Sequence, residues 1–348
     1  MPGATVAAVG SDGDDEVVHD FSPLLLVHKS GRLERPLSSC RSYVPPGLDA
    51  ATGVQSKDVP LSSSSSFVRL YLPPAATESG GDVKKNNAAN LPVVVYFHGG
   101  GFVMGSAASC VYHRFLNDLA AAIPVVAVSV DYRLAPEHAL PAAYEDSLAA
   151  LKWVLSAAAD PWLDAHGDPA RVFLAGDSAG GNICHHLAMH PEIRAAGGVK
   201  GAVLIHPWFW GKEPIGGEKE HRRRGRGPTK RKHLWEFVCP GAADGVDDPR
   251  MNPMVPGAPG LEGLACEKVM VCVAEGDHLR WRGEAYAEAV ARASKEKCGD
   301  DDDDEQPAAV EVEVFESEGV GHVFYLLDPE MGEAKRLLGR IAAFVSAK

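Results

Sequence analysis

Short runs rich in β-branched residues recur along this chain, and segments long enough for a helix separate several of them. The runs lie at 67–73, 93–97, 125–130, 172–176, 202–206, 269–274 and 310–315, and the helix-length segments at 109–122, 143–157, 179–190, 283–297 and 330–346. Nearly continuous apolar strands that alternate with helices are typical of a mostly parallel sheet covered by helices on both faces. The pattern therefore predicts an α/β fold. The last run alternates valine with glutamate, which suits a strand near the edge of the sheet.

Two stretches do not follow this alternation. Residues 209–264 contain many glycines and prolines and no clear strand, so we expect them to form a cap over the carboxyl ends of the strands. Residues 21–48 are amphipathic, and the part 21–39 is expected to form a helix or a strand pair. We predict a disordered N-terminus over 1–20, because it is small, glycine-rich and acidic, and a single domain over 21–348.

Two charged runs are expected to be surface loops. The basic run 222–232 lies inside the expected cap and is interpreted as a tolerated surface loop, with a nuclear signal or a patch for an anionic substrate as the alternatives. The acidic run 300–305 is interpreted as a solvated loop between a helix and the edge strand.

Composition narrows the class of protein. The formal net charge of −13 argues against a nucleic-acid-binding protein, because phosphate contacts require clustered cations. The 7 cysteines show no paired spacing, which favours reduced thiols over disulfides or a zinc site. No secretory signal is recognisable, and no run approaches the roughly 18 apolar residues of a membrane-spanning helix. We expect a cytoplasmic protein, with the nucleus as the alternative, and either a monomer or a homodimer.

The segment FLAGDSAGGN (173–182) predicts a strand that turns sharply into a helix at Ser178. Its core, GDSAG (176–180), has the pattern G-x-S-x-G, in which the serine is a nucleophile and the glycines leave room for a crowded turn. The N–H groups at the start of the following helix would face developing negative charge. A serine that only caps the helix, or a phosphate-binding turn, is the alternative.

Three consecutive glycines follow a predicted strand in the sequence HGGGF (98–102). Glycines allow the main chain to approach a reacting carbonyl closely, as an oxyanion hole requires. The dinucleotide-binding pattern G-x-G-x-x-G is not met, because Gly105 falls one position too late. We therefore predict that the backbone N–H groups of Gly100, Gly101 and Ala179 would receive an oxyanion.

A nucleophilic serine needs a base and an acid that orients the base. In hydrolases with the G-x-S-x-G turn, the acid and then the histidine follow the serine along the chain, each after a late strand. Asp277 follows the last predicted strand but one, and His322 follows the last, in a glycine-flanked loop. Glu275 and Asp328 are the rivals for the acid. We predict that His322 takes the proton of Ser178 and that Asp277 orients the imidazole.

No cofactor and no metal are expected. His186 and His190 have the i, i+4 spacing of metal ligands on a predicted helix, but the acid of an H-E-x-x-H site does not accompany them. These two residues and the neighbouring His185 are interpreted as ordinary helix-face histidines.

Together, the segments HGGGF (98–102), DYRLAPEHALPAAYED (131–146), GDSAGGN (176–182) and GDHLRWRGEAY (276–286) resemble the plant carboxylesterase family. This family is part of the hormone-sensitive-lipase-like group of the α/β-hydrolases. The resemblance runs from about residue 20 to the end of the sequence. It implies an α/β-hydrolase fold, a cap formed partly by residues 21–50, and hydrolysis of short- to medium-chain acyl esters of small molecules. It also implies the same triad and the same oxyanion hole.

Other functions occur on the scaffold that this resemblance implies. Gibberellin receptors resemble the family but have lost the catalytic histidine, so the presence of His322 argues against a hormone-like receptor. Hydroxyisoflavanone dehydratases and tuliposide-converting enzymes keep much of the triad. Motifs therefore do not separate a lyase or an intramolecular transesterase from a hydrolase, whereas analysis of the products does.

Overall fold

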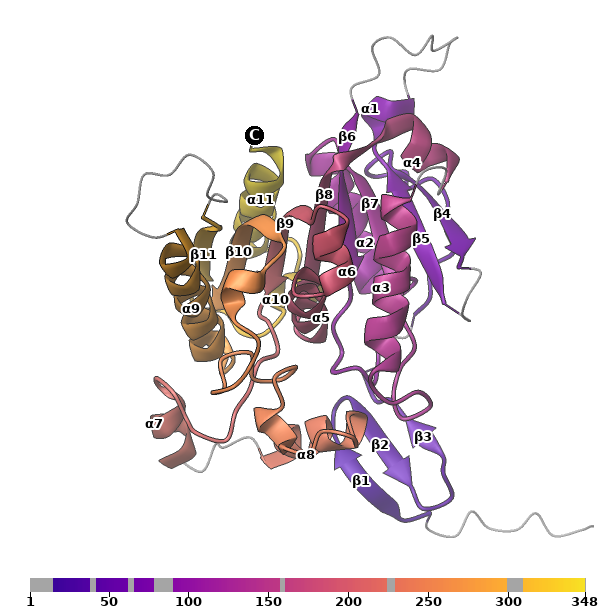
Figure 1. Ribbon diagram of the computed structural model, residues 1–348. Coiled ribbons are helices and arrows are strands. Elements are labelled where there is room, and N and C mark those ends of the chain that lie inside the picture. Colours follow the sequence, from indigo (N-terminus) through magenta and orange to yellow (C-terminus); the bar gives the residue numbers. More distant parts are fainter. Residues whose placement is uncertain are drawn as a thin grey trace, which may run out of the picture.

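The computed structural model describes residues 15–37, 42–61, 66–77, 90–156, 160–223, 229–298 and 309–347 (Figure 1). At its centre is an 8-stranded sheet with the strand order β11-β10-β9-β8-β6-β7-β5-β4. The strands are β4 (Gln55–Pro60), β5 (Phe67–Leu72), β6 (Leu91–Phe97), β7 (Val126–Asp131), β8 (Gly167–Asp177), β9 (Val199–Ile205), β10 (Cys266–Ala274) and β11 (Glu311–Ser317). The strands β11, β10, β9, β8, β6 and β7 are parallel to one another. Strand β5 pairs with β7 in the antiparallel direction, and β4 pairs with β5 in the same way.

The predicted α/β fold with a mostly parallel sheet is confirmed, and every predicted run forms a strand. The last run forms β11, which lies at one edge of the sheet as expected. Strand β4 was not predicted. Its sequence QSKDVP is largely polar, because an edge strand pairs on one side only and buries little of its length.

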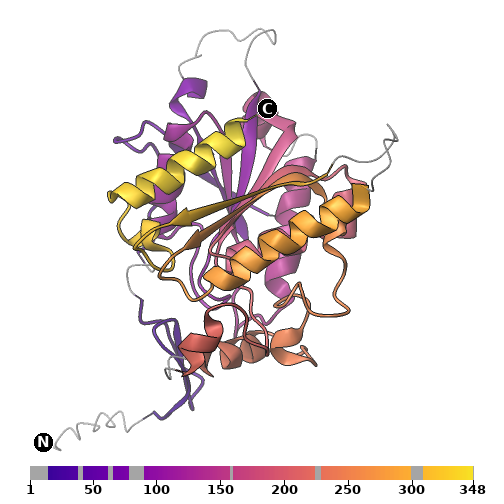
Figure 2. The same ribbon diagram turned by 90° about the vertical axis from the view of Figure 1, so that its left-hand side faces the viewer.

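Helices cover both faces of the sheet. The long ones are α2 (Cys110–Ala122), α3 (Ala142–Leu155), α5 (Ala179–Ala188), α9 (Arg280–Cys298) and α11 (Gly332–Ser346); short ones are α1 (Pro74–Thr77), α4 (Pro161–His166), α6 (Pro191–Ala195) and α10 (Phe324–Leu327). Buried side chains of α3, α5 and α9 join the core on one face, and those of α2 and α11 the core on the other. Figure 2 shows β10 and β11 running between α9 and α11.

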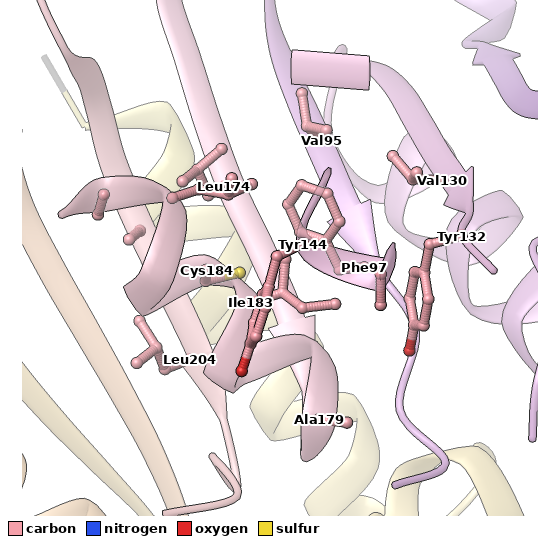
Figure 3. Close-up of a cluster of buried hydrophobic side chains, with 14 of the residues drawn as sticks. Val95, Phe97, Val130, Tyr132, Tyr144, Leu174, Ala179, Ile183, Cys184 and Leu204 are labelled. Atoms are coloured by element: carbon pink, nitrogen blue, oxygen red, sulfur yellow. The ribbon is translucent and has the colours of Figure 1, made fainter. Parts of the chain in front are cut away.

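Alternate residues of one central strand supply the two cores. Val95 and Phe97 of β6 belong to one core cluster, and Val94 and Tyr96 to the other, because successive side chains of a strand point to opposite faces. Figure 3 shows the first cluster, in which Ile183 of α5 lies over the sheet. Burial on both faces explains why the central strands read as continuous apolar runs.

A smaller layer covers one end of the sheet. It contains a 3-stranded antiparallel sheet of β1 (Val17–Phe21), β2 (Leu25–His28) and β3 (Leu33–Glu34), and the helices α7 (Glu218–Arg223) and α8 (Thr229–Val238) (Figure 1). The rings of Phe21 and Phe237 are 4.9 Å apart, so the N-terminal sheet and the 209–264 segment pack together. The N-terminal segment thus forms strands, and the described part of 209–264 contains helical turns and no strand.

One boundary expected from the sequence is wrong. Strand β1 begins at Val17, inside the segment 1–20 that was expected to be disordered, because its pairing with β2 orders a sequence with little helical or strand periodicity of its own. Residues 1–14, the acidic run 300–305 and the side chains of the basic run 222–232 lie outside the described part of the chain. Of the helices that are described, none combines the length and the apolar character needed to cross a membrane.

Candidate active site

Ser178 lies at the sharp corner between β8 and α5. Its backbone angles are φ 53° and ψ −114°, and positive φ is uncommon for a residue other than glycine. Two backbone hydrogen bonds hold this conformation: the Ser178 N–H donates to Ile205 O at 2.9 Å, and the Trp208 N–H donates to Ser178 O at 2.9 Å. The corner is therefore strained locally and fixed by the segment that follows β9.

The glycines on either side of Ser178 are required by close packing. A Cβ atom built on Gly180 would lie 1.8 Å from the carbonyl oxygen of Phe97, at the end of β6. A Cβ on Gly176 would lie 2.6 Å from the backbone of Gly180. The pattern G-x-S-x-G thus lets the corner lie directly against the neighbouring strand.

We expect Gly180→Ala to lower the free energy of unfolding by at least about 3 kcal/mol, because backbone atoms rather than a flexible side chain occupy the space. Gly339→Ala is the matched control. Gly339 lies in α11 with no atom within 4 Å of a built Cβ, and there alanine should stabilise the helix by about 0.5–1 kcal/mol. Urea unfolding of both variants measures the difference. Equal free energies of unfolding for the two variants would show that the backbone around Gly180 can move to accommodate a methyl group.

The glycine loop after β6 presents free backbone donors. Gly100 and Gly101 have φ angles of 105° and 61°, which favour glycine. The Gly99 N–H is already engaged, by the Tyr112 hydroxyl at 2.9 Å and by Asp177 Oδ1 at 3.0 Å. Within the described residues, no acceptor binds the N–H groups of Gly100, Gly101 or Ala179. These are the three groups predicted from the sequence, and Ala179 begins α5, where a backbone N–H has no partner inside the helix.

Asp177 joins the serine corner to this glycine loop. Besides the Gly99 N–H, its carboxylate accepts the hydroxyls of Tyr96 at 2.8 Å and Tyr112 at 3.2 Å. Burial raises the pKa of Asp177 to about 6, although the Tyr96 hydrogen bond and the charge of His322 oppose the increase. The residue before Ser178 is therefore a buried structural link, which its position in the motif alone does not reveal.

Asp277 and His322 meet at the same end of the sheet. His322 Nδ1 donates to Asp277 Oδ2 at 2.5 Å, and the Leu279 N–H donates to Oδ1 at 3.0 Å. The side chain of Asp277 is 1% exposed and that of His322 29% exposed. Burial alone would raise the pKa of Asp277, but the charge and the hydrogen bond of His322 outweigh it and hold this pKa well below its usual range.

The rivals for the acid lie elsewhere. Glu275 Oε2 accepts the Gly319 N–H at 2.8 Å, and Asp328 follows α10, after the His322 loop. His278 Nδ1 also lies 3.3 Å from Asp277 Oδ1. Asp277 is thus the carboxylate that contacts His322, with a second histidine on its other oxygen.

The serine and the histidine lie on neighbouring parts of one edge but do not contact through a hydrogen bond. Strands β8, β9, β10 and β11 are consecutive in the sheet, so the loops bearing Ser178, Asp277 and His322 follow one another along its carboxyl edge. Within the described residues, no hydrogen bond joins Ser178 Oγ to His322. Catalytic hydrogen bonds are often long in an enzyme without substrate and shorten when the substrate binds.

Sequence reasoning missed two residues around the site. His206, directly after β9, accepts the Val323 N–H on Nδ1 at 3.0 Å. Asn182 on α5 accepts the Tyr144 hydroxyl at 2.7 Å and donates to Arg250 O at 2.7 Å. The signal for His206 was available, because it follows a parallel strand just as Asp277 and His322 do. Asn182 gave no comparable signal.

Of the histidines that raised the question of a metal, His185 is buried, and His186 and His190 are partly exposed. His185 binds the hydroxyl of Tyr286 at 3.0 Å, and His186 stacks on Tyr144 with ring centroids 4.1 Å apart. Another set, His206, Asp277 and His322, has potential ligand atoms within 4.8 Å of one another. The 2.5 Å hydrogen bond between Asp277 and His322 already occupies two of those atoms, which favours acid–base chemistry over a metal centre.

Apolar side chains of the covering layer contact the glycine loop. A Cβ built on Gly101 would lie 3.0 Å from Leu234 of α8, 3.3 Å from Leu24 in the turn before β2, and 3.8 Å from Trp208. Segments far apart in the sequence therefore surround the predicted oxyanion donors. A reacting carbonyl at this position would be enclosed by apolar groups on the covering side.

Comparison with known proteins identifies the family of this chain. Residues 94–326 match the family model described as alpha/beta hydrolase fold. The chain is 40% identical over 344 residues to "Probable carboxylesterase 13" of Arabidopsis thaliana, covering 95% of this chain and 98% of that protein. It is 41% identical over 344 residues to the 2-hydroxyisoflavanone dehydratase of Glycyrrhiza echinata, covering 95% and 96%. Identity is 39% over 340 residues to the chloroplastic tuliposide A-converting enzyme 1 of Tulipa gesneriana, covering 96% and 80%.

Solved structures of esterases share the fold. The esterase of Pyrobaculum calidifontis is 29% identical with a TM-score of 0.64, and the match covers 84% of each chain. A thermostable carboxylesterase cloned from a metagenomic library is 28% identical with a TM-score of 0.66, and the match covers 88% of this chain and 91% of that one.

Proposed function

Since this chain is a carboxylesterase-like member of the hormone-sensitive-lipase-like group of the α/β-hydrolase family, we propose that it cleaves short- to medium-chain acyl esters of small molecules through an acyl-enzyme. The observation that supports this most directly is the hydrogen-bonded pair of buried Asp277 and accessible His322, on the same sheet edge as the strained Ser178. A protein that only binds a ligand needs no such pair.

In the first half of the proposed reaction, Ser178 Oγ attacks the ester carbonyl carbon while His322 Nε2 takes the hydroxyl proton. Asp277 keeps the proton of His322 on Nδ1 and stabilises the imidazolium that forms. The negative oxygen of the tetrahedral intermediate binds the N–H groups of Gly100, Gly101 and Ala179, and one such donor contributes about 3 kcal/mol to lowering the barrier. His322 then protonates the leaving alcohol, and the acyl group stays on Ser178.

In the second half of the proposed reaction, water hydrolyses the acyl-enzyme. His322 removes a proton from a water molecule, whose oxygen attacks the acyl carbonyl at the same donors. The acid product leaves, and Ser178 regains its proton from His322. Each turnover therefore consumes one ester and one water and yields one acid and one alcohol.

The position of Leu234 beside the glycine loop suggests that this side chain limits the length of the acyl chain that the site accepts. We expect Leu234→Ala to raise the ratio of kcat/KM for an octanoate ester to that for an acetate ester by about tenfold or more, because it removes an apolar wall beside Gly101. Leu261→Ala is the control, since Leu261 is buried in the core away from the loop. If Leu234→Ala leaves this ratio unchanged, another side chain limits the length of the acyl group.

The proposed function is tested by hydrolysis of a p-nitrophenyl ester series from acetate to octanoate, followed by product analysis with natural ester classes. The relatives named as a dehydratase and as a tuliposide-converting enzyme are about as similar to this chain as the named carboxylesterase. Incorporation of oxygen from labelled water into the acid identifies a hydrolase. Loss of water from a hydroxyisoflavanone, or a lactone released without water uptake, would identify a lyase or a transesterase. Tight binding of a small hydrophobic acid without turnover would identify a receptor.

A further inference from the structure

The segment from Ile205 to Trp208 lies between the two loops that the proposed reaction must align. It follows β9, and its backbone contacts Ser178 on both sides, through the Ser178 N–H to Ile205 O and the Trp208 N–H to Ser178 O. A side chain from this segment is therefore fixed relative to the serine corner.

The side chain of His206 extends from this segment to the other loop. Its Nδ1 accepts the N–H of Val323, the residue directly after His322, at 3.0 Å. The His206 and His322 rings are 5.7 Å apart, and one nitrogen of His206 lies within 4.8 Å of ligand atoms of both Asp277 and His322. Val323 has φ 48°, a conformation that a β-branched residue adopts only when its surroundings hold it there.

His206 is itself rigid and uncharged. The residue is 1% exposed, its backbone N–H donates to Cys272 O at 2.8 Å, and its φ is 47°. Burial, together with the charge of His322, lowers the pKa of His206 to about 3. The ring is therefore neutral at physiological pH, which leaves Nδ1 free to accept. A neutral ring also adds no repulsion when His322 becomes positive during the reaction.

We propose that His206 is a positioning residue for the base: its hydrogen bond to Val323 fixes the backbone after His322 and so sets the His322 ring against Ser178. The inference rests on the proposed function for the role of His322. It adds a residue that the triad does not include, and it explains how the base is aligned with a serine to which it forms no hydrogen bond in the described structure.

Three variants test this role. His206→Phe keeps a ring of similar size but has no acceptor, and we expect kcat to fall by about 10- to 100-fold with KM nearly unchanged. In His206→Asn, the side-chain oxygen can accept the Val323 N–H, and asparagine tolerates positive φ, so kcat should stay within about threefold of the parent. His185→Phe removes another buried histidine, 7% exposed, whose ring nitrogen bonds the Tyr286 hydroxyl, and it should lower Tm without lowering kcat.

A second readout is independent of turnover. The proton between His322 Nδ1 and Asp277 should give a far-downfield ¹H NMR resonance, present in the parent and in His206→Asn and broadened or lost in His206→Phe. The proposal is overturned if folded His206→Phe retains both kcat and this resonance, or if His206→Asn is as impaired as His206→Phe. If the parent hydrolyses no ester but the resonance follows the expected pattern, the positioning role stands and the proposed function fails.

Discussion

Ser178→Ala is expected to reduce kcat/KM for ester hydrolysis by about ten-thousandfold or more, because no covalent acyl-enzyme can form without the Oγ atom. The remaining activity would come from the oxyanion donors and from substrate binding. Substrate binding itself should be nearly unchanged, since the substitution removes only one hydroxyl group from the site. Steady-state kinetics with a p-nitrophenyl ester measure the loss, and thermal shift with a slowly reacting ester measures the binding.

Ser147→Ala is the matched control for this experiment. Ser147 is fully buried on α3, and its Oγ has no partner among the residues that the structure describes, so removing it should leave kcat/KM within about twofold. Retention of most activity by Ser178→Ala would mean that Ser178 only shapes the corner. A similar loss in both variants would point to a general effect on folding.

Asp277→Asn is expected to lower kcat by about a thousandfold to ten-thousandfold. The carboxylate only accepts hydrogen bonds, so it keeps the His322 proton on Nδ1 and leaves Nε2 free to take the proton of Ser178. An amide can donate to Nδ1 and would favour the opposite tautomer, in which Nε2 carries the proton and cannot act as a base. Single-turnover kinetics of acylation measure this step directly.

The two rival carboxylates supply the controls. Glu275→Gln and Asp328→Asn should retain kcat within about threefold, because neither group contacts His322. The double variant Ser178→Ala/Asp277→Asn should be no worse than Ser178→Ala alone, since the members of a triad act as a unit. A large loss in Glu275→Gln, or additive losses in the double variant, would contradict the assignment of Asp277.

Much of the fold was predictable because strands and helices depend on the pattern of apolar residues along the chain. The apolar runs that became β6 to β10 are buried on both faces, and that burial demands continuous apolar residues. Strands β1 and β4 escaped prediction for the opposite reason. Both are short, β1 is largely exposed and β4 is only partly buried, so pairing with a neighbour rather than burial determines their conformation.

Some residues of the candidate site were also predictable from local sequence patterns, and others were not. Ser178 and the glycines around it were recognisable because a strained corner restricts its nearest neighbours in the chain. Asp277 and His322 were recognisable because each follows a strand. By contrast, Asn182 and the tyrosines that bind Asp177 act through contacts between segments distant in sequence, and such contacts impose no pattern on the residues around them.

The sequence by itself determined the strands, the helices between them and the order in which serine, acid and histidine follow their strands, because each of these depends on residues close together in the chain. Only the tertiary structure decided which loops meet. Strand order places β10 between β9 and β11, and this brings His206 and His322 together although 116 positions separate them by number, 322 minus 206. Strand pairing joins segments that are distant in the sequence and depends on the packing of the whole sheet. Local periodicity therefore does not determine which strands become neighbours.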